Sequence, residues 1–312
     1  MNTTSYLTKT WKRINSSFVD RKDQESMTIS ELSQLIRYLK YVGFEPFQPL
    51  TKFETAMLII SIDVDAGSRR LGLVNEGRND RYVNDRLTEY QIGAIEETAL
   101  PLFINLFDYL EVPVTLAYRC QLLELGEDVL APVFQTSVKH DIGCHGHSHR
   151  SFTDLSPEEA EQELIVSSVL MSKSGIVPQS FIFPRNKVAH LDLLHKHGYK
   201  CYRDRGGPIS DGMYIKKCNQ LYDIHPSLHV GVGASHAILE KILDISIRRR
   251  SPMHIWFHMW SFGYDKQSIQ KSINMIFFPF LMYARKKVDA GELSFETMLS
   301  SINRLKPFTK KS

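Results

Sequence analysis

Three histidines fall within five residues of this chain, at His145, His147 and His149. Zinc-like ions bind histidine nitrogens together with a carboxylate and keep one coordination position open for water. His145 and His149 are four residues apart, and on one helical turn that spacing would point both imidazoles at a common point. The segment therefore predicts part of a metal site, with His147 as a supporting or solvent-facing neighbour.

Two carboxylates far upstream, Asp63 and Asp65, could complete this site. Residues two apart on a strand share a face, so both side chains can reach the same ion. One carboxylate can bind the metal while the other takes a proton from water, because the cation places the two in different electrostatic settings. The spacing alone leaves open which carboxylate has which role.

The elements that precede these residues have the character of buried strands. Residues 56–62 form a near-continuous apolar run that ends at Asp63, as expected of a strand covered on both faces. Residues 138–145 form a second short strand that leads into the histidines. Because α/β barrels place their active sites at the carboxyl ends of such strands, the two clusters favour a functional site over capping aspartates or an exposed histidine-rich loop.

Strands and helices alternate along the rest of the chain, which predicts a parallel α/β architecture. We expect a closed but irregular barrel, with a doubly wound open sheet as the second choice. Residues 1–53 are predicted to form an N-terminal helical extension and residues 54–312 the catalytic domain. The expected strands are 56–63, 112–118, 138–145, 180–184, 199–202, 220–224 and 253–258, and the expected helices are 88–110, 156–174, 188–197, 235–249, 266–290 and 295–305.

Composition narrows the class of protein. Among 312 residues, 43% are hydrophobic, enough for a sizeable core, and 38 basic against 35 acidic residues give no support to nucleic-acid binding. The four cysteines form no CxxC motif and are expected to be reduced thiols. Neither a secretory signal nor a transmembrane run is visible, so we expect a cytoplasmic protein, with the inner membrane surface as a second place of action. The apolar run 276–283, followed by basic residues 285–287, predicts a core helix or a peripheral membrane contact.

Four motifs follow one another along the chain: Ile62-Asp63-Val64-Asp65, His145-Gly146-His147-Ser148-His149, Phe183-Pro184-Arg185-Asn186 and Ile255-Trp256-Phe257-His258. In this order they resemble the polysaccharide deacetylase family, also called the NodB-homology domain or carbohydrate esterase family 4, over residues 55–305. The resemblance implies a distorted (β/α) barrel. The chain departs from the family pattern in two motifs. Its acidic pair is Asp-x-Asp rather than two adjacent aspartates, and its arginine motif is Phe-Pro-Arg-Asn rather than the commoner Arg-x-Pro-Tyr.

The resemblance also implies the metal ligands and the cofactor. Asp65, His145 and His149 would bind a divalent ion, with zinc expected first and cobalt or nickel also suiting such a site.

The same resemblance implies the catalytic roles. Asp63 would be the general base, Arg185 would orient it by a charge-assisted hydrogen bond, and His258 would be the general acid that protonates the leaving amine.

The sequence gives weaker signals for the residues that contact the substrate than for the metal ligands. Trp256 alternates with His258 along a predicted strand, so both can face the pocket, and Trp260 follows closely. Asp223, in the segment Asp223-Ile224-His225-Pro226, is the nearest match to the family's fourth motif. We expect these three residues, Trp256, Trp260 and Asp223, to bind the substrate.

Together these features predict a metal-dependent hydrolase that removes an N-acetyl group from an amino sugar. The expected substrate is an N-acetylated carbohydrate, either a surface glycan or its cytoplasmic or lipid-linked precursor. One alternative is another metal-dependent C–N hydrolase that uses His145 and His147 as a His-x-His pair. Another is a non-catalytic glycan-binding relative.

Overall fold

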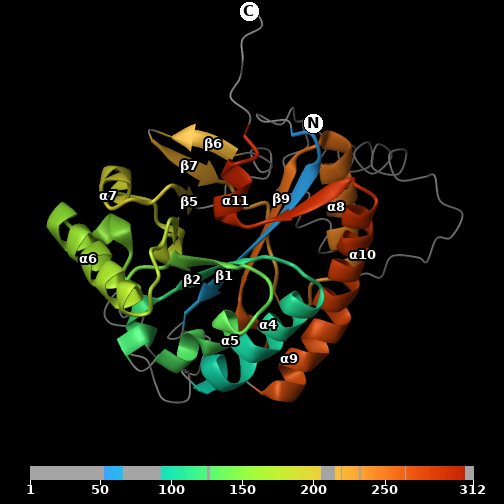
Figure 1. Cartoon of the computed structure of the whole chain (residues 1–312), viewed down its shortest axis with the longest axis horizontal. Helices are drawn as coiled ribbons and strands as arrows, with labels where there is room; N and C mark the ends of the chain where they lie inside the picture. The colour runs from blue at the N-terminus through green and yellow to red at the C-terminus, as the bar shows by residue number, and fades with distance from the viewer. Residues whose placement is uncertain are drawn as a thin grey trace, which may run out of the picture.

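The fold is organised around one curled sheet of mostly parallel strands (Figure 1). The computed structural model describes residues 53–65, 93–124, 127–204, 215–218, 220–231, 233–263 and 265–305. The strands in these residues are Ala56–Val64 (β1), Thr115–Tyr118 (β2), Asp141–Cys144 (β3), Ser180–Ile182 (β4), Cys201–Arg203 (β5), Ile215–Cys218 (β6), Leu221–Ile224 (β7), Leu228–His229 (β8), Pro252–His258 (β9) and Leu293–Glu296 (β10).

The order of the strands across the sheet is β6-β7-β5-β4-β3-β2-β1-β9-β8. β10 pairs with the first half of β1, and β2 pairs with its second half. Neighbouring strands are parallel except β6 and β7, which are antiparallel. The carboxyl ends of the parallel strands therefore meet on one side of the sheet.

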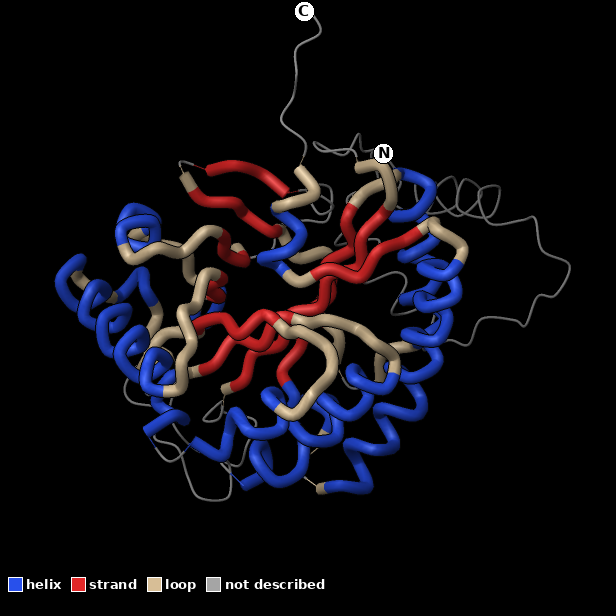
Figure 2. Tube along the Cα trace, in the orientation of Figure 1, coloured by secondary structure: helices blue, strands red, loops and turns tan. Residues whose placement is uncertain are grey.

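Helices cover one face of this sheet (Figure 2). The longer ones are η3 (Ala94–Ala99), α4 (Leu100–Tyr109), α6 (Pro157–Lys173), α7 (Leu191–Lys196), α8 (His236–Arg249), α9 (Lys266–Ser272), η10 (Ile273–Phe277) and α10 (Phe278–Asp289). Shorter helices are η4 (Cys120–Glu124), η5 (Glu127–Leu130), α5 (Ala131–Phe134), η6 (Phe152–Asp154), η7 (Pro184–Asn186), η9 (Met259–Phe262) and α11 (Met298–Ile302).

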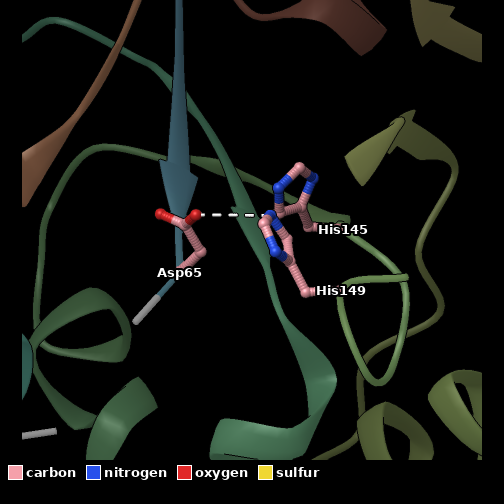
Figure 3. A group of neighbouring side chains, drawn as sticks. All are labelled: Asp65, His145 and His149. Carbon is pink, nitrogen blue, oxygen red and sulfur yellow. Dashed lines mark ion pairs between the residues drawn. The ribbon is translucent and has the colours of Figure 1, made fainter. Parts of the chain in front are cut away.

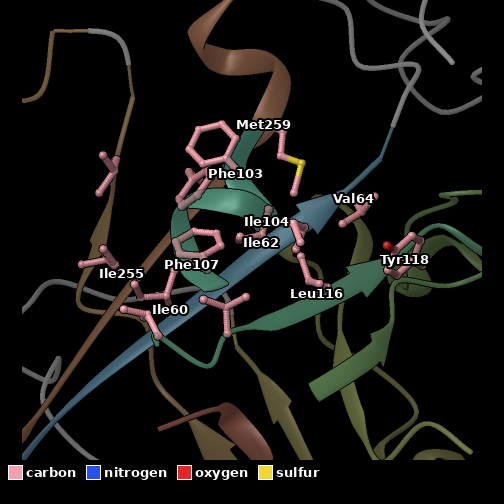
Figure 4. Packing of buried hydrophobic residues seen from close by; sticks show 14 of the residues in the cluster. Ile60, Ile62, Val64, Phe103, Ile104, Phe107, Leu116, Tyr118, Ile255 and Met259 are labelled. Carbon is pink, nitrogen blue, oxygen red and sulfur yellow. The ribbon is translucent and has the colours of Figure 1, made fainter. Parts of the chain in front are cut away.

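The two faces of β1 have different chemistry because side chains alternate along a strand. Ile60 and Ile62 point to the helix-covered face, where Phe103 and Phe107 of α4 pack over them (Figure 4). Burial of each such side chain stabilises the fold by about 1.5–3 kcal/mol. Met57 and Ile59 point to the opposite, inner face. The same alternation places the side chains of Ser61 and Asp63 on this inner face.

The expected distorted (β/α) barrel is confirmed as a curled half-barrel, but the expected closure is not seen, because the sheet of the described residues ends at β6 and β8. Several expected helices form at the predicted places. α6 begins with a capping box in which Ser156 accepts from the backbone of Glu159 and Glu159 accepts from that of Ser156. The predicted helix 266–290 is present as α9, η10 and α10. Its apolar run is largely core, since Phe277, Phe280 and Leu281 are buried.

The prediction of a helix over residues 295–305 is wrong for its first residues, 295 and 296. Residues 293–296 form β10 against β1, and the helix begins only after Thr297, whose side chain accepts from the backbone of Ser300. Residues 293–296 are extended because they pair with β1, and a pairing between distant segments cannot be recognised from the local sequence. Apart from Phe53, the predicted extension 1–53 lies outside the described residues. No helix in the described part of the chain is both long enough and apolar enough to cross a bilayer.

Candidate metal centre and active site

Three side chains from two strand ends converge at the carboxyl side of the sheet (Figure 3). Asp65 follows β1, and His145 and His149 follow β3. Ligand-capable atoms of the three residues all lie within 4.8 Å of one another. The Nε2 atom of His149 is 3.4 Å from Oδ2 of Asp65, and the two imidazole rings are 5.0 Å apart. The structure therefore brings the three predicted metal ligands together in a buried cluster.

The histidine segment is a loop rather than the helical turn considered from its spacing. Gly146 has a φ of +71° and His149 a φ of 64°, both in the left-handed region. A Cβ atom at Gly146 would lie 3.2 Å from Cγ of Pro184, so glycine suits this position for both conformation and space. Two left-handed residues fold the chain back so that His145 and His149 face the same point.

A buried glutamate holds this loop in place. Oε2 of Glu163, on the inward side of α6, accepts hydrogen bonds from the backbone N–H groups of His147 and Ser148 at 2.8 and 2.9 Å. The Ser148 hydroxyl donates to the other carboxylate oxygen. The His147 ring turns away from the cluster and pairs with Glu124 at 2.7 Å. Glu163 was not predicted, although an acidic residue on the buried stripe of a helix, between Ala160 and Ser167, is a recognisable signal.

The cluster fits a divalent cation. Nδ1 of His145 donates to the backbone oxygen of Ile182 at 2.8 Å, which leaves Nε2 as the acceptor atom. That Nε2 is buried and has no hydrogen-bond partner among the described residues. Burial lowers the pKa of His145 and holds the pKa of His149 well below its usual range, so both imidazoles are neutral at pH 7. Neutral imidazole is the form that binds metal ions.

Asp63 forms a two-point ion pair with Arg203, which lies at the end of β5. Nη1 and Nη2 of Arg203 are each 2.7 Å from one carboxylate oxygen. Burial alone would raise the pKa of Asp63, but the charge of Arg203, followed by His145 and His258, holds that pKa well below its usual range. Asp63 is therefore a buried carboxylate that stays ionised at neutral pH.

Arg203 was not among the predicted site residues. It is fully buried, donates to Ser61 and Asn186 at 3.1 and 3.2 Å, and lies 4.3 Å from the ring centroid of Trp256. Arg185 lies in η7. Burial is the main cause that lowers the pKa of His149, and the charge of Arg185 adds to it after those of His145 and Arg119. The role of Arg185 in orienting Asp63 stays a prediction.

His258 lies between the two aspartates. Its Nδ1 atom is 3.6 Å from Oδ2 of Asp63 and 3.5 Å from Oδ1 of Asp65. The His258 ring stacks on Trp260 with centroids 4.6 Å apart, and Nε1 of Trp260 donates to Oδ1 of Asp65 at 2.8 Å. Trp260 is only 5% exposed, and its observed contacts position Asp65 and His258, while its predicted contact with substrate stays a prediction. Trp256 is partly exposed, with its ring 5.6 Å from that of His258.

A series of buried hydrogen bonds extends from Arg203, the partner of Asp63, to His254. Ser61 accepts from Arg203 and donates to Nε2 of His254 at 2.8 Å, while Nδ1 of His254 donates to the backbone oxygen of Ile224 at 3.1 Å. Burial, together with the charge of Arg203, lowers the pKa of His254 to about 3. His254 is therefore a neutral support for the guanidinium that holds Asp63.

Asp223 is placed apart from these residues. In the pairing of β5 with β7 it lies beside Tyr202, so its side chain leaves the sheet on the face opposite to Arg203. Burial and the neighbouring Asp204 raise the pKa of Asp223 to about 8. Asp204, Asp223 and His225 form a second group of ligand-capable side chains. The predicted contact of Asp223 with substrate stays a prediction.

No protein-family model and no curated protein matches the sequence significantly. Solved structures do resemble the fold. A Mycobacterium smegmatis protein described as a polysaccharide deacetylase aligns with a TM-score of 0.60 at 15% identity, over 86% of this chain and 98% of the other. A Pseudomonas aeruginosa protein with the same description gives 0.59 at 12% identity, over 80% and 90%. The Puue allantoinase gives 0.60 at 13% identity, over 92% and 97%. At these identities the likeness establishes the fold.

Proposed function

We propose that this chain, which has the fold of the polysaccharide deacetylases, is a metal-dependent hydrolase that removes an N-acetyl group from an amino sugar. The observation that carries the proposal is the buried cluster of Asp65, His145 and His149, with Asp63 and His258 directly beside it. Such a set of one carboxylate, two imidazoles and two further titratable groups is what hydrolysis of an amide requires.

Asp65, His145 and His149 hold the ion in this proposal. A divalent ion bound there supplies a Lewis acid for the amide oxygen and lowers the pKa of water. Trp260 fixes the orientation of Asp65 through the indole N–H, and Glu163 fixes the loop that carries both histidines. Zinc is the expected ion, and cobalt and nickel also suit the ligand set.

Asp63 acts as the general base. Arg203 keeps the carboxylate ionised and fixes its plane, so the base has the correct charge and direction before substrate arrives. An attacking water transfers its proton to Asp63 as the new C–O bond forms. The C–N bond breaks only when the departing amine receives a proton.

His258 supplies that proton. Its Nδ1 faces the two aspartates, and the ring is held by stacking on Trp260. The side chain is one-fifth exposed, so its outer edge can reach a bound substrate. Trp256 and His258 come from the same face of β9, which supports Trp256 as a contact for the sugar ring.

Acetate release tests this proposal. The full chain is stripped with chelator, reloaded with zinc, cobalt or nickel, and offered sugar nucleotides, lipid-linked amino sugars and oligomers that carry N-acetylglucosamine. Metal-dependent release of acetate from at least one class supports the proposal. The absence of acetate from every class, by a protein that has bound metal, would overturn it.

A second candidate is hydrolysis of another C–N bond, such as that of a cyclic amide. The likeness to the Puue allantoinase supports it. In this case the same Asp65–His145–His149 cluster would act, because the His147 ring pairs with Glu124 and does not join His145. Ring opening of allantoin without acetate release from any sugar would favour this candidate. Glycan binding without turnover of either substrate would favour a non-catalytic relative.

We also propose a cytoplasmic place of action, with peripheral contact at the inner membrane surface. Two exposed apolar side chains support the contact, Met275 of η10 at 59% and Phe278 of α10 at 38% exposure, and Lys271 lines the same surface hollow as Met275. Flotation with vesicles that contain anionic lipid tests it, and a protein that stays at the bottom of the gradient would contradict the contact.

A further inference from the structure

We propose that Asp204, Asp223 and His225 form a second divalent-cation site, distinct from the Asp65–His145–His149 cluster. Asp204 directly follows β5, Asp223 lies in β7 and His225 follows β7. The site therefore joins the carboxyl ends of two neighbouring strands. It goes beyond the proposed hydrolase activity, which needs only the first cluster.

The three side chains are close enough to share one ion. Ligand-capable atoms of all three lie within 4.8 Å of one another. Nδ1 of His225 is 2.8 Å from Oδ2 of Asp204. Two of the three residues, Asp223 and His225, are buried, and Asp204 is partly exposed.

An unpartnered oxygen of Asp223 is the independent observation that points to a ligand. Oδ1 of Asp223 is buried and has no hydrogen-bond partner among the residues that the structure describes, and the residue is only 6% exposed. A buried carboxyl oxygen without a donor is costly, and the charge of Asp204 beside it makes the ionised form of Asp223 costlier still. Lys216 lies opposite Asp223 on the edge strand β6, and its charge lowers the pKa of Asp223 less than burial and Asp204 raise it. A cation bound between Asp204 and Asp223 would give this oxygen a partner and would stabilise both side chains as carboxylates.

The second site connects to the catalytic face through the backbone of β5. Arg203 reaches Asp63 on the inner face, and the next residue, Asp204, contributes to the second cluster. Asp223 leaves the sheet on the opposite face, so the two ions would not share a ligand. An ion at Asp204 would fix the end of β5 and thereby help to hold Arg203 in position.

The ligand set selects the class of ion. One imidazole with two carboxylates suits zinc, cobalt, nickel or manganese, whereas magnesium and calcium prefer sites made entirely of oxygen atoms. The proposed ion is therefore of the same class as the one expected at the first cluster.

Metal stoichiometry tests the second site. The full chain is stripped, saturated with Zn²⁺, freed of loose ions by gel filtration, and analysed for zinc per chain. We expect two ions in the wild type, one in His149→Asn, one in Asp223→Asn and none in the double variant. His197→Asn is the matched control, since His197 pairs with Glu161 near the surface and this variant should retain two ions.

The outcomes separate this inference from the proposed function. One ion in the wild type, lost in His149→Asn, would overturn the second site and leave the first intact. Two ions that persist in both Asp223→Asn and His225→Gln would also overturn it. If both of those variants fail to fold, the His149→Asn protein decides the question. If His149→Asn retains one zinc ion and its Tm rises with zinc, the second site is supported. If His149→Asn retains no zinc, the second site is overturned.

Discussion

The guanidinium of Arg203 holds both carboxylate oxygens of Asp63 at 2.7 Å, across 140 positions of sequence. Both side chains are buried, so the pair is shielded from solvent and its strength depends on geometry. The pair explains how a buried aspartate can remain ionised beside two histidines. It also makes Arg203 the residue on which the charge state of the proposed base depends.

Replacing Arg203 by lysine should impair catalysis more than metal binding. Lysine keeps a positive charge but loses the two-point contact, so the carboxylate of Asp63 is less well oriented and its pKa rises. We expect kcat to fall by about 10²-fold, as misplacement of a catalytic group does. The acid limb of the kcat/KM profile should move to higher pH. Arg185→Lys is the matched comparison, and a shift of the acid limb in that variant instead would assign the orienting role to Arg185.

Trp260→Phe should weaken metal binding while leaving the fold intact. Phenylalanine can keep the stacking on His258 but cannot donate to Asp65. Loss of such a supporting contact costs about 10–100-fold in metal affinity. Competition with a chelator of known affinity measures the change. Trp256→Phe should leave metal affinity unchanged and raise KM; equal metal affinity in Trp260→Phe and the wild type would contradict the positioning role.

Glu163→Ala should destabilise the histidine loop. The backbone N–H groups of His147 and Ser148 lose their acceptor; an unsatisfied buried donor costs about 1–3 kcal/mol, and these two half-buried donors should each cost less than that. We expect a lower free energy of unfolding by urea and weaker zinc binding. Glu163→Gln, which keeps one acceptor oxygen, should restore part of both. Glu158→Ala on the exposed side of the same helix should change neither. Unchanged zinc affinity in Glu163→Ala would contradict the role of Glu163 in holding the histidine loop.

Acid should destabilise the metal-free protein partly through His254. Its folded-state pKa of about 3 lies below the usual 6.5, so the unfolded chain binds a proton that the folded chain excludes. The contribution is fully present above 6.5 and is lost as pH falls from 6.5 toward 3, by at most about 1.4 kcal/mol per pH unit. His254→Gln should therefore reduce the slope of unfolding free energy against pH in this window. Urea titrations across the window measure the slope, and an unchanged slope would mean that His254 is protonated in the folded state.

The sequence predicts the barrel and the metal cluster because both depend on local patterns. The apolar run of β1 ends in Asp63 and Asp65, and the alternation of side chains places Asp63 on the inner face. Arg203 and Glu163 could not be assigned in the same way. Each reaches the site from an element whose position depends on the packing of the whole sheet. β10 was missed for the same reason, since its strand exists by pairing with β1.

The most direct test compares His149→Asn with His147→Asn for bound metal and for acetate release from N-acetylated sugars. Both changes remove one imidazole from the same loop, but only His149 faces Asp65. We predict that His149→Asn loses the ion of the first cluster and all acetate release, while His147→Asn retains both. Loss of metal and activity in His147→Asn alone, or full activity in His149→Asn, would contradict the proposed centre.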